Sequence, residues 1–232
     1  MKKISFGVIA AVLLCFVLAG CSQEKDIAGS ERIEALRKEA QSWESGRYFI
    51  TNVDTDVLEQ VFSFYYDSDD RQVYLCEGVQ NGRYYSEYSN GLELFREENG
   101  VGALIPSDNE TYAVYTKKEP HPYSTGQLFF YLKDYIASWE EKPDGEGNMC
   151  YIYTYDHERL SKVLGNTVES FVTSYAFDEN GDFVYFRQHN SSDITGNENS
   201  GVMDFTYEIT VEDVNAVTEI ENPVIIGGSA VE

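Results

Sequence analysis

Three Asn-Gly pairs, spaced nine residues apart, constrain the fold of this chain more than any other feature. They are Asn81-Gly82, Asn90-Gly91 and Asn99-Gly100, and they lie between Arg47 and Thr116, where the side chains alternate with a period of two. Asn-Gly is the strongest short-range hairpin signal because both positions tolerate positive φ. Alternation with a period of two is typical of half-buried strands. The spacing therefore predicts an up-and-down antiparallel meander.

Helices are predicted on both sides of this meander. The first begins at Ser30 and ends at Gly46, because four apolar residues recur at helical spacing between them. Pro120 and Pro122 interrupt the strands, and a second helix is predicted from Ser124 or Thr125 to about Trp139. The apolar stripe of the first helix consists of Ile33, Leu36, Ala40 and Trp43.

The last third of the chain is predicted to be mostly extended. A strand is expected over Met149 to Tyr155, followed by a short helix that contains Leu160, Val163 and Leu164. A long hairpin then runs from Glu169 to Gln188, and the closing strand from Met203 to Val211 alternates apolar and polar residues.

This order of elements, from Glu31 to about Val217, resembles the LolA/LppX-like family of lipoprotein carriers and lipid-binding envelope lipoproteins. The resemblance is one of order and pattern and includes no diagnostic motif. It implies an α+β fold: a single strongly curved antiparallel sheet, or half-barrel, with two longer helices and one short helix on its concave side. It also implies an apolar cavity between the sheet and the helices.

The N-terminus resembles the signal of a bacterial lipoprotein. Lys2 and Lys3 precede an apolar run from Ile4 to Leu18, and the small residues Ala19 and Gly20 precede Cys21. In such signals a diacylglyceryl group is attached to the cysteine, and the chain is then cleaved just before this residue. The cysteine also carries a further acyl chain such as palmitate. The apolar run is shorter than the roughly 20 residues that a membrane-spanning helix needs. The pattern predicts an extracytoplasmic protein anchored to the cell membrane through lipidated Cys21.

Four segments follow from these patterns. Residues 1–20 are the expected signal peptide, and residues 21–30 the lipidated cysteine with a flexible tether. Residues 31–221 are the expected LolA/LppX-like α+β domain. Residues 222–232 are expected to form a loose C-terminal tail.

The composition excludes one class of partner. The formal net charge is −23, so phosphate backbones would be repelled and no nucleic-acid partner is expected. Anionic lipid head groups would be repelled too, so membrane residence depends on the acyl anchor. The 18 Tyr and 13 Phe residues are nevertheless enough for a packed core.

Two cysteines, Cys76 and Cys150, remain after the leader and the acylated residue are set aside. A disulfide between them is chemically allowed outside the cytoplasm. Both lie in apolar, strand-like runs, where a free thiol packs as a small hydrophobic group. Sequence leaves both alternatives open, because a bridge requires Cα atoms within about 7 Å of each other.

Catalytic and metal-binding patterns are weak. His121, His157 and His189 are predicted to be loop or surface residues, and no nucleophile, zincin or phosphate-loop motif is present. The acidic runs at Asp67 to Asp70 and Asp178 to Asp182 are better explained as turns than as calcium loops. We therefore expect no enzyme, cofactor or metal. Abundant carboxylate pairs leave a glycan hydrolase as a minor alternative.

The aromatic residues are the best candidates for a binding site. If the sheet curves around the second helix, an apolar space between them could hold a lipid or an acyl chain. The alternative is a filled core in a protein-interaction or envelope-sensor module, whose protein partner the sequence does not identify. The candidate ligand-binding residues are Phe62, Phe64, Leu128, Leu132, Tyr135, Trp139, Tyr151 and Tyr153.

Overall fold

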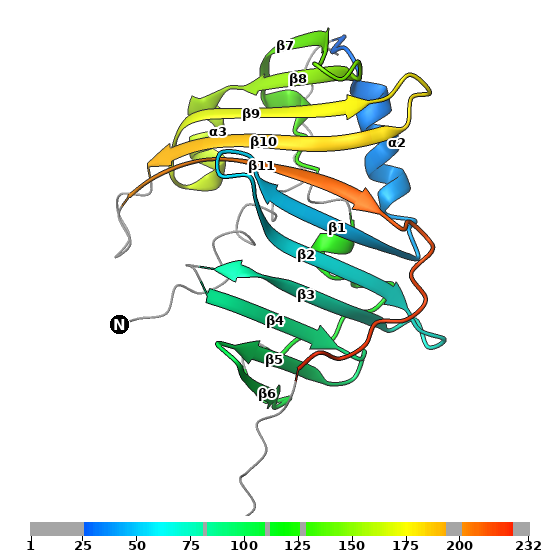
Figure 1. Cartoon of the computed structure of the whole chain (residues 1–232). Coiled ribbons are helices and arrows are strands. Elements are labelled where there is room, and N and C mark those ends of the chain that lie inside the picture. The colour runs from blue at the N-terminus through cyan, green and yellow to red at the C-terminus, as the bar shows by residue number, and fades with distance from the viewer. Residues whose placement is uncertain (1–25, 81–82, 110–111, 126–128, 194–200, 225–232) are drawn as a thin grey trace, which may run out of the picture. The chain divides into compact units, whose positions relative to one another are not determined.

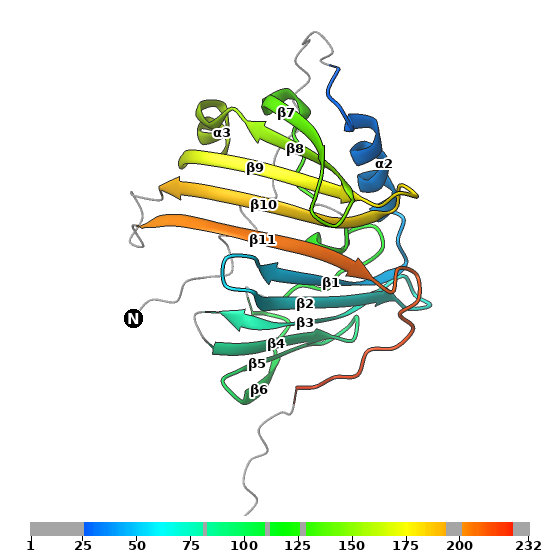
Figure 2. The same ribbon diagram turned by 45° about the horizontal axis from the view of Figure 1, so that its top comes forward.

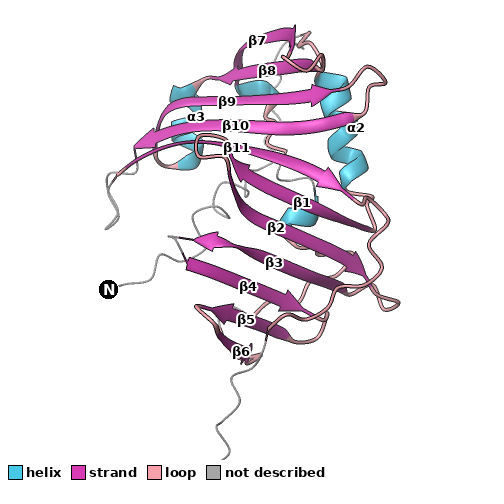
Figure 3. Cartoon of the chain, in the orientation of Figure 1, coloured by secondary structure: helices cyan, strands magenta, loops and turns pink. Residues whose placement is uncertain are grey.

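A computed structural model describes residues 26–80, 83–109, 112–125, 129–193 and 201–224. Contacts divide these residues into two compact units. Unit 1 lies within residues 1–39 and 126–208, and unit 2 lies within residues 40–125 and 209–232. Each unit combines antiparallel strands with helical segments, as Figures 1 and 3 show. The chain is therefore α+β, whereas the half-barrel curvature and the domain limits 31–221 stay predictions.

Unit 2 contains the predicted meander. Its sheet has the order β6-β5-β4-β3-β2-β1, so strands that follow one another in sequence are neighbours, and each pair is antiparallel. A short 3-10 helix, η1 (Pro122–Thr125), follows the strands. The strands are β1 (Ser45–Asn52), β2 (Val57–Tyr66), β3 (Gln72–Gln80), β4 (Arg83–Ser89), β5 (Leu94–Glu98) and β6 (Val101–Ile105).

Unit 1 contains the remaining strands in the order β11-β10-β9-β8-β7, and the last residues of β11 belong to unit 2 as the neighbour of β1. Figure 2 shows α2 beside this group of strands. The elements are α2 (Ser30–Ala40), η2 (Lys133–Tyr135), β7 (Ile136–Pro143), β8 (Met149–Tyr155), α3 (His157–Leu164), β9 (Thr167–Phe177), β10 (Phe183–Asp193) and β11 (Val202–Glu212). The predicted strand from Met149, the long hairpin and the closing strand are confirmed.

The first helix is confirmed, but it ends earlier than predicted. Ile33, Leu36 and Ala40 are buried as one stripe, as their spacing indicates. The helix ends at Ala40 rather than at Gly46 because Ser45 is held in β1. Its carbonyl accepts a hydrogen bond from the Asn215 amide, and its hydroxyl accepts one from the Val217 amide. Contacts distant in sequence therefore override the local helical pattern.

The second long helix, predicted from Ser124 or Thr125 to about Trp139, is wrong over the described residues. Residues 129–132 are extended, η2 follows, and β7 begins at Ile136. Phe129, Phe130 and Tyr131 are all buried, which one helical stripe cannot achieve. Side chains from other elements satisfy this segment's carbonyls: Tyr175 donates to the Phe130 carbonyl at 2.8 Å, and Arg37 donates to the Tyr131 carbonyl at 3.1 Å. Leu128 lies outside the described residues.

The short helix α3 is confirmed. The Asp156 side chain accepts a hydrogen bond from the Arg159 amide, which caps the N-terminus. Gly165 ends the helix in the left-handed conformation, with φ of 72°. Leu160 is fully buried, and α3 contacts β9 within unit 1.

Three hairpin loops share one construction. Asp67, Asp144 and Asp178 each accept hydrogen bonds from the amides two and four residues later, at 2.8 to 2.9 Å. In each loop the residue three positions later has positive φ: Asp70, Gly147 or Gly181. The carboxylate therefore holds the turn in its conformation by accepting hydrogen bonds from the backbone amides. Because these oxygens are occupied by amides, the turn interpretation of the acidic runs at Asp67 and Asp178 agrees with the structure.

These loops predict a specific pH dependence. Hydrogen bonds from Asn148 and from two amides lower the pKa of Asp144 from 3.8 to about 2. A depressed carboxyl pKa stabilises the fold above pH 3.8, and this stabilisation is lost as the pH falls towards 2. Asp144→Asn cannot take up this proton, so its urea midpoint should fall less steeply over that range than that of the wild-type protein. Glu146→Gln removes an equal charge from the same loop and should keep the wild-type slope; equal slopes for Asp144→Asn and the wild type would refute the assignment.

The C-terminal segment is packed on unit 2 as far as Val224. Val224 is buried against Val73 and Tyr88, and Ile220 packs against the same cluster. Residues 222–224 are therefore held against the sheet, although they were expected to begin a loose tail. Residues 225–232 lie outside the described residues.

Candidate functional site

Aromatic rings fill one face of the sheet in unit 2. Tyr48, Phe62 and Phe64 are fully buried, and the ring centroids of Phe62 and Phe64 lie 5.9 Å apart. The loop before η1 and η1 itself cover them: the His121 ring stacks on Phe62 at 4.7 Å, and the Tyr123 ring of η1 meets Phe62 edge-on at 5.4 Å. The chain thus covers this face with its own side chains.

Unit 1 is covered in the same way. The Phe130 ring lies 4.7 Å from that of Phe171, and the Tyr131 ring lies 5.4 Å from that of Tyr153. Phe129 packs on Phe186 at 6.0 Å. The segment that was predicted to be a helix therefore supplies the aromatic cover of this face as an extended strip.

The predicted ligand-binding residues are divided between the two units. Phe62 and Phe64 lie together in unit 2, and the other described candidates lie in unit 1. Tyr153 is fully buried, whereas Trp139 is 39% exposed on β7. Their role in ligand binding stays a prediction. The remaining described candidates of unit 1 are Leu132, Tyr135 and Tyr151, which are partly buried.

The two cysteines are free and buried in the structure, so the disulfide considered above is not formed. Cys76 accepts a hydrogen bond from the Gln60 amide group at 3.2 Å, and the Cys150 sulfur lies 3.3 Å from the Tyr185 hydroxyl. Burial raises the pKa of Cys76 to about 12, so this thiol stays protonated at neutral pH.

The histidines differ in their surroundings. Burial lowers the pKa of His121 to about 3, so this ring is neutral, and its Nδ1 accepts a hydrogen bond from the Tyr123 amide. His157 is exposed at the start of α3. His189 lies 3.3 Å from the Thr206 hydroxyl and 3.9 Å from Asp204. Among the described residues, no group of three or more His, Cys, Asp or Glu side chains is arranged to hold a metal ion.

An ion pair lies on the aromatic face of unit 2. Arg96 donates to one Glu87 oxygen through Nε at 3.0 Å and also through a terminal nitrogen, and Tyr74 donates to the other oxygen at 2.8 Å. The side chains of Glu87 and Arg96 are 17% and 25% exposed. Both carboxylate oxygens are therefore engaged by protein groups, which is a structural arrangement.

Exposed apolar side chains lie on both faces at one end of the unit 2 sheet. In a meander, the ends of β1, β3 and β5 and the starts of β2, β4 and β6 lie at the same end of the sheet, as Figure 1 shows. Val79 and Tyr84 are opposed in the ladder, and the Asn99 amide donates to the Tyr84 carbonyl. We call this group the apolar rim, and its members are 40% to 68% exposed. The apolar rim consists of Val53, Val57, Leu58, Val79, Tyr84 and Val101.

Acidic residues surround the apolar rim. Asp54, Asp56, Glu59 and Glu98 are exposed beside its members. The Tyr84 hydroxyl donates to Glu77 at 2.5 Å, and partial burial together with this bond raises the pKa of Tyr84 to about 12. The rim is thus an apolar surface with negatively charged borders, a combination that suits a partner with basic residues next to an apolar segment.

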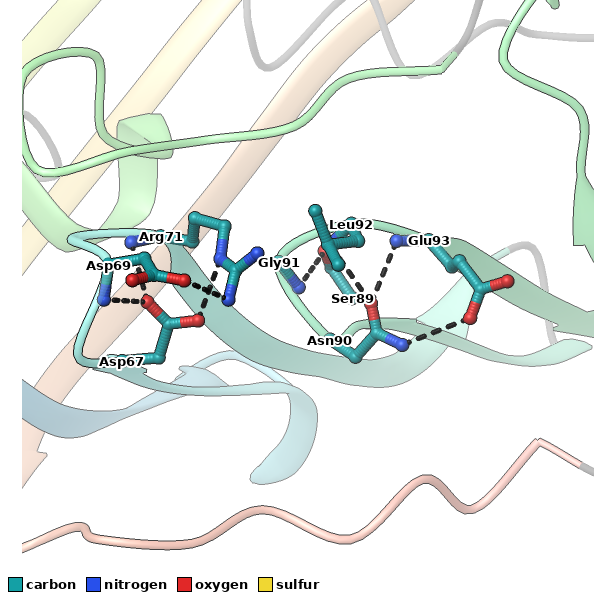
Figure 4. A network of polar contacts seen from close by, with 8 residues as sticks. All are labelled: Asp67, Asp69, Arg71, Ser89, Asn90, Gly91, Leu92 and Glu93. Atoms are coloured by element: carbon teal, nitrogen blue, oxygen red, sulfur yellow. Dashed lines mark hydrogen bonds and ion pairs between the residues drawn. The ribbon is translucent and has the colours of Figure 1, made fainter.

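Polar contacts link the turns at the opposite end of the unit 2 sheet, as Figure 4 shows, although Leu92 there is 58% exposed. Arg71 forms ion pairs with Asp67 and Asp69, and the Asn90 side chain accepts hydrogen bonds from the amides of Leu92 and Glu93. Gly91 has φ of 83°, and a Cβ there would lie 2.9 Å from the Arg71 Cβ. The β2–β3 and β4–β5 turns are therefore closed by polar contacts. The β1–β2 turn is closed in the same way, because the Asn52 side chain accepts hydrogen bonds from the amides of Asp54 and Thr55.

Sequence reasoning did not find the apolar rim. Its members flank three different turns, so no local motif joins them. The available signal was the position of valine and leucine next to turn residues, as in Val53-Asp54 and Val57-Leu58. The register of the meander is needed to bring these positions to one end of the sheet.

No protein-family model matches the chain, and no curated protein sequence matches it. Among solved structures, the lipoprotein LppX of Mycobacterium tuberculosis is similar with 6% sequence identity and a TM-score of 0.35. The match covers 83% of this chain and 97% of that chain. It is a weak likeness that concerns the fold alone. In the described part of the chain, no helix combines the length and the apolar character of a membrane span.

Proposed function

We propose that the protein is an extracytoplasmic lipoprotein, anchored to the cell membrane through Cys21, that acts as a non-enzymatic binding module. The pattern of the first 21 residues supports the anchor. The apolar rim is the observation that supports binding, because six large apolar side chains are exposed at one end of the unit 2 sheet and two of them, Val79 and Tyr84, are directly opposed in the ladder. The partner recognised there is a protein segment that combines apolar residues with lysine or arginine.

The aromatic packing favours recognition at the surface over binding of a lipid inside the protein. Phe62, Phe64 and Tyr153 were proposed to line a cavity for a lipid or acyl chain, and each is fully buried among other rings. Binding of a lipid there would require these rings to move. The filled-core alternative requires no such movement and leaves recognition to the surface.

Site-specific photocrosslinking tests the proposal. A photoreactive phenylalanine analogue at Val79 should give one defined crosslinked product in isolated membranes, and the yield should fall as salt is raised, because the borders of the rim are acidic. The matched control is the same analogue at Val163 of α3, since the two valines are 46% and 38% exposed. The same products from both positions, or no product from Val79, would overturn the role of the rim.

A further inference from the structure

The chain becomes buried very soon after the proposed anchor. Ile27 is 3% exposed, and its carbonyl accepts a hydrogen bond from the Ser30 amide at 3.1 Å. The Ala28 carbonyl accepts a hydrogen bond from Tyr153 at 2.6 Å, and Gly29 packs so closely on the Tyr151 ring that a Cβ would lie 2.4 Å from it. The tether expected over residues 21–30 is therefore shorter, because it ends before Ile27.

This burial limits the distance between unit 1 and the membrane. Six peptide steps separate Cys21 from Ile27, and a fully extended chain spans at most about 3.5 Å per residue, or roughly 20 Å. The lipid on Cys21 would thus hold Ile27 within about 20 Å of its attachment point. That distance is shorter than the width of a small domain, so the part of unit 1 around Ile27 must lie near the bilayer.

Trp139 lies next to this part of unit 1. It is opposite Tyr153 in the β7–β8 ladder, and opposed residues project from the same face with Cβ atoms about 5 Å apart. Tyr153 contacts Ala28 from that face, so Trp139 is on the side where the chain leaves for its anchor. β7 is the edge strand of unit 1, and Figures 1 and 2 both show the start of α2 near its end.

The exposed side chain of Trp139 suits a phospholipid bilayer as its partner. An indole has a large apolar body and an N–H donor, which suits the polar boundary layer of a bilayer. The neighbours Glu140 and Glu141 are exposed and acidic, so charge does not attract β7 to anionic lipid. Contact would instead follow from the short tether.

We infer that edge strand β7 rests on the membrane surface, with Trp139 in the headgroup layer of the phospholipid bilayer. This inference rests on the proposed lipidation of Cys21. It fixes which side of unit 1 faces the membrane.

Quenching of Trp139 fluorescence by brominated lipid tests this inference. The acylated full-length protein is reconstituted into phosphatidylcholine vesicles that carry bromine on the upper part of the acyl chains. The chain has two tryptophans, and Trp43 is only 6% exposed, so the difference between the wild type and Trp139→Phe isolates the signal of Trp139. The Trp139 position is 39% exposed, so this variant does not disturb a buried site. We expect the difference signal to lose most of its intensity and to shift to shorter wavelength.

The possible outcomes separate the two claims. If the protein floats with the vesicles but the Trp139 signal is unquenched, the orientation is wrong and the anchor stands. If mass spectrometry finds no acyl group on Cys21, or the protein does not float, then the proposed lipidation is wrong. The proposed orientation of β7 is then wrong too, because it rests on that lipidation. Cys21→Ser should abolish both flotation and quenching; quenching that persists in this variant would show that the tether does not place Trp139.

Discussion

Glu87→Ala is expected to lower the free energy of unfolding by about 2–4 kcal/mol, because it leaves a partly buried guanidinium and a buried hydroxyl without their acceptor. Arg96 and Tyr74 both donate to this carboxylate. Tyr74 is 1% exposed, so water cannot readily replace the lost oxygen. Urea unfolding of the chain from residue 22 onwards measures the change.

The partners of Glu87 provide the control. In the Glu87→Ala/Arg96→Ala double variant the unpaired cation is also removed, so the loss should be smaller than the sum of the two single losses. Glu98→Ala, an exposed glutamate on the adjacent strand β5, should change stability by less than about 0.5 kcal/mol. Additive losses at Glu87 and Arg96 would show that the two side chains are not coupled.

Phe62→Ala is expected to have the largest effect of any single aromatic truncation in unit 2, with a loss of about 3–5 kcal/mol. Phe62 is fully buried and touches rings on every side: Phe64, Tyr74, His121 and Tyr123 lie with centroids 4.7 to 5.9 Å from it. These rings come from two strands, a loop and η1, so they cannot all move into the space left by the ring. A loss of this size is a large fraction of the stability of a typical domain.

Phe95→Ala is the matched control for this prediction. Phe95 lies on β5 of the same sheet and is only partly buried, with its ring 6.0 Å from that of Tyr88. Its truncation should cost clearly less than that of Phe62 in the same urea titration. Equal losses would mean that Phe62 is not enclosed as the structure has it.

Local sequence signals predicted the elements whose structure depends on nearby residues. The turn at Asn99-Gly100 has positive φ at both positions, as an Asn-Gly hairpin requires. The stripe of α2 and the strands β8 to β11 also follow from periodicity alone. The turn at Asp178 was recognised for the same reason, because its aspartate and glycine act within five residues.

Elements that depend on distant partners could not be predicted in this way. The apolar spacing of residues 128–139 fits a helix, yet Arg37 and Tyr175 bind the carbonyls of the segment and hold residues 129–132 extended. Neither partner is within 40 positions of Phe130, so no local pattern reveals it. The apolar rim was missed for a related reason, since exposure at Val79 depends on which strands lie beside it.

The candidate ligand residues are divided between the two units, and this division also depends on contacts between residues distant in sequence. Phe62 and Tyr153 belong to similar aromatic strands, so their patterns suggested one shared apolar space. In the structure each is enclosed by rings of its own unit: His121 and Tyr123 cover Phe62, and Tyr131 covers Tyr153. Which loop covers which strand is decided by the tertiary fold.

Recognition at the surface requires above all that the protein fills both aromatic faces with its own side chains. Native mass spectrometry of the chain from residue 22 onwards, incubated with oleate, tests this claim most directly. We predict the mass of the polypeptide alone. One oleate retained per chain would contradict the account and would restore the aromatic faces as a lipid-binding site.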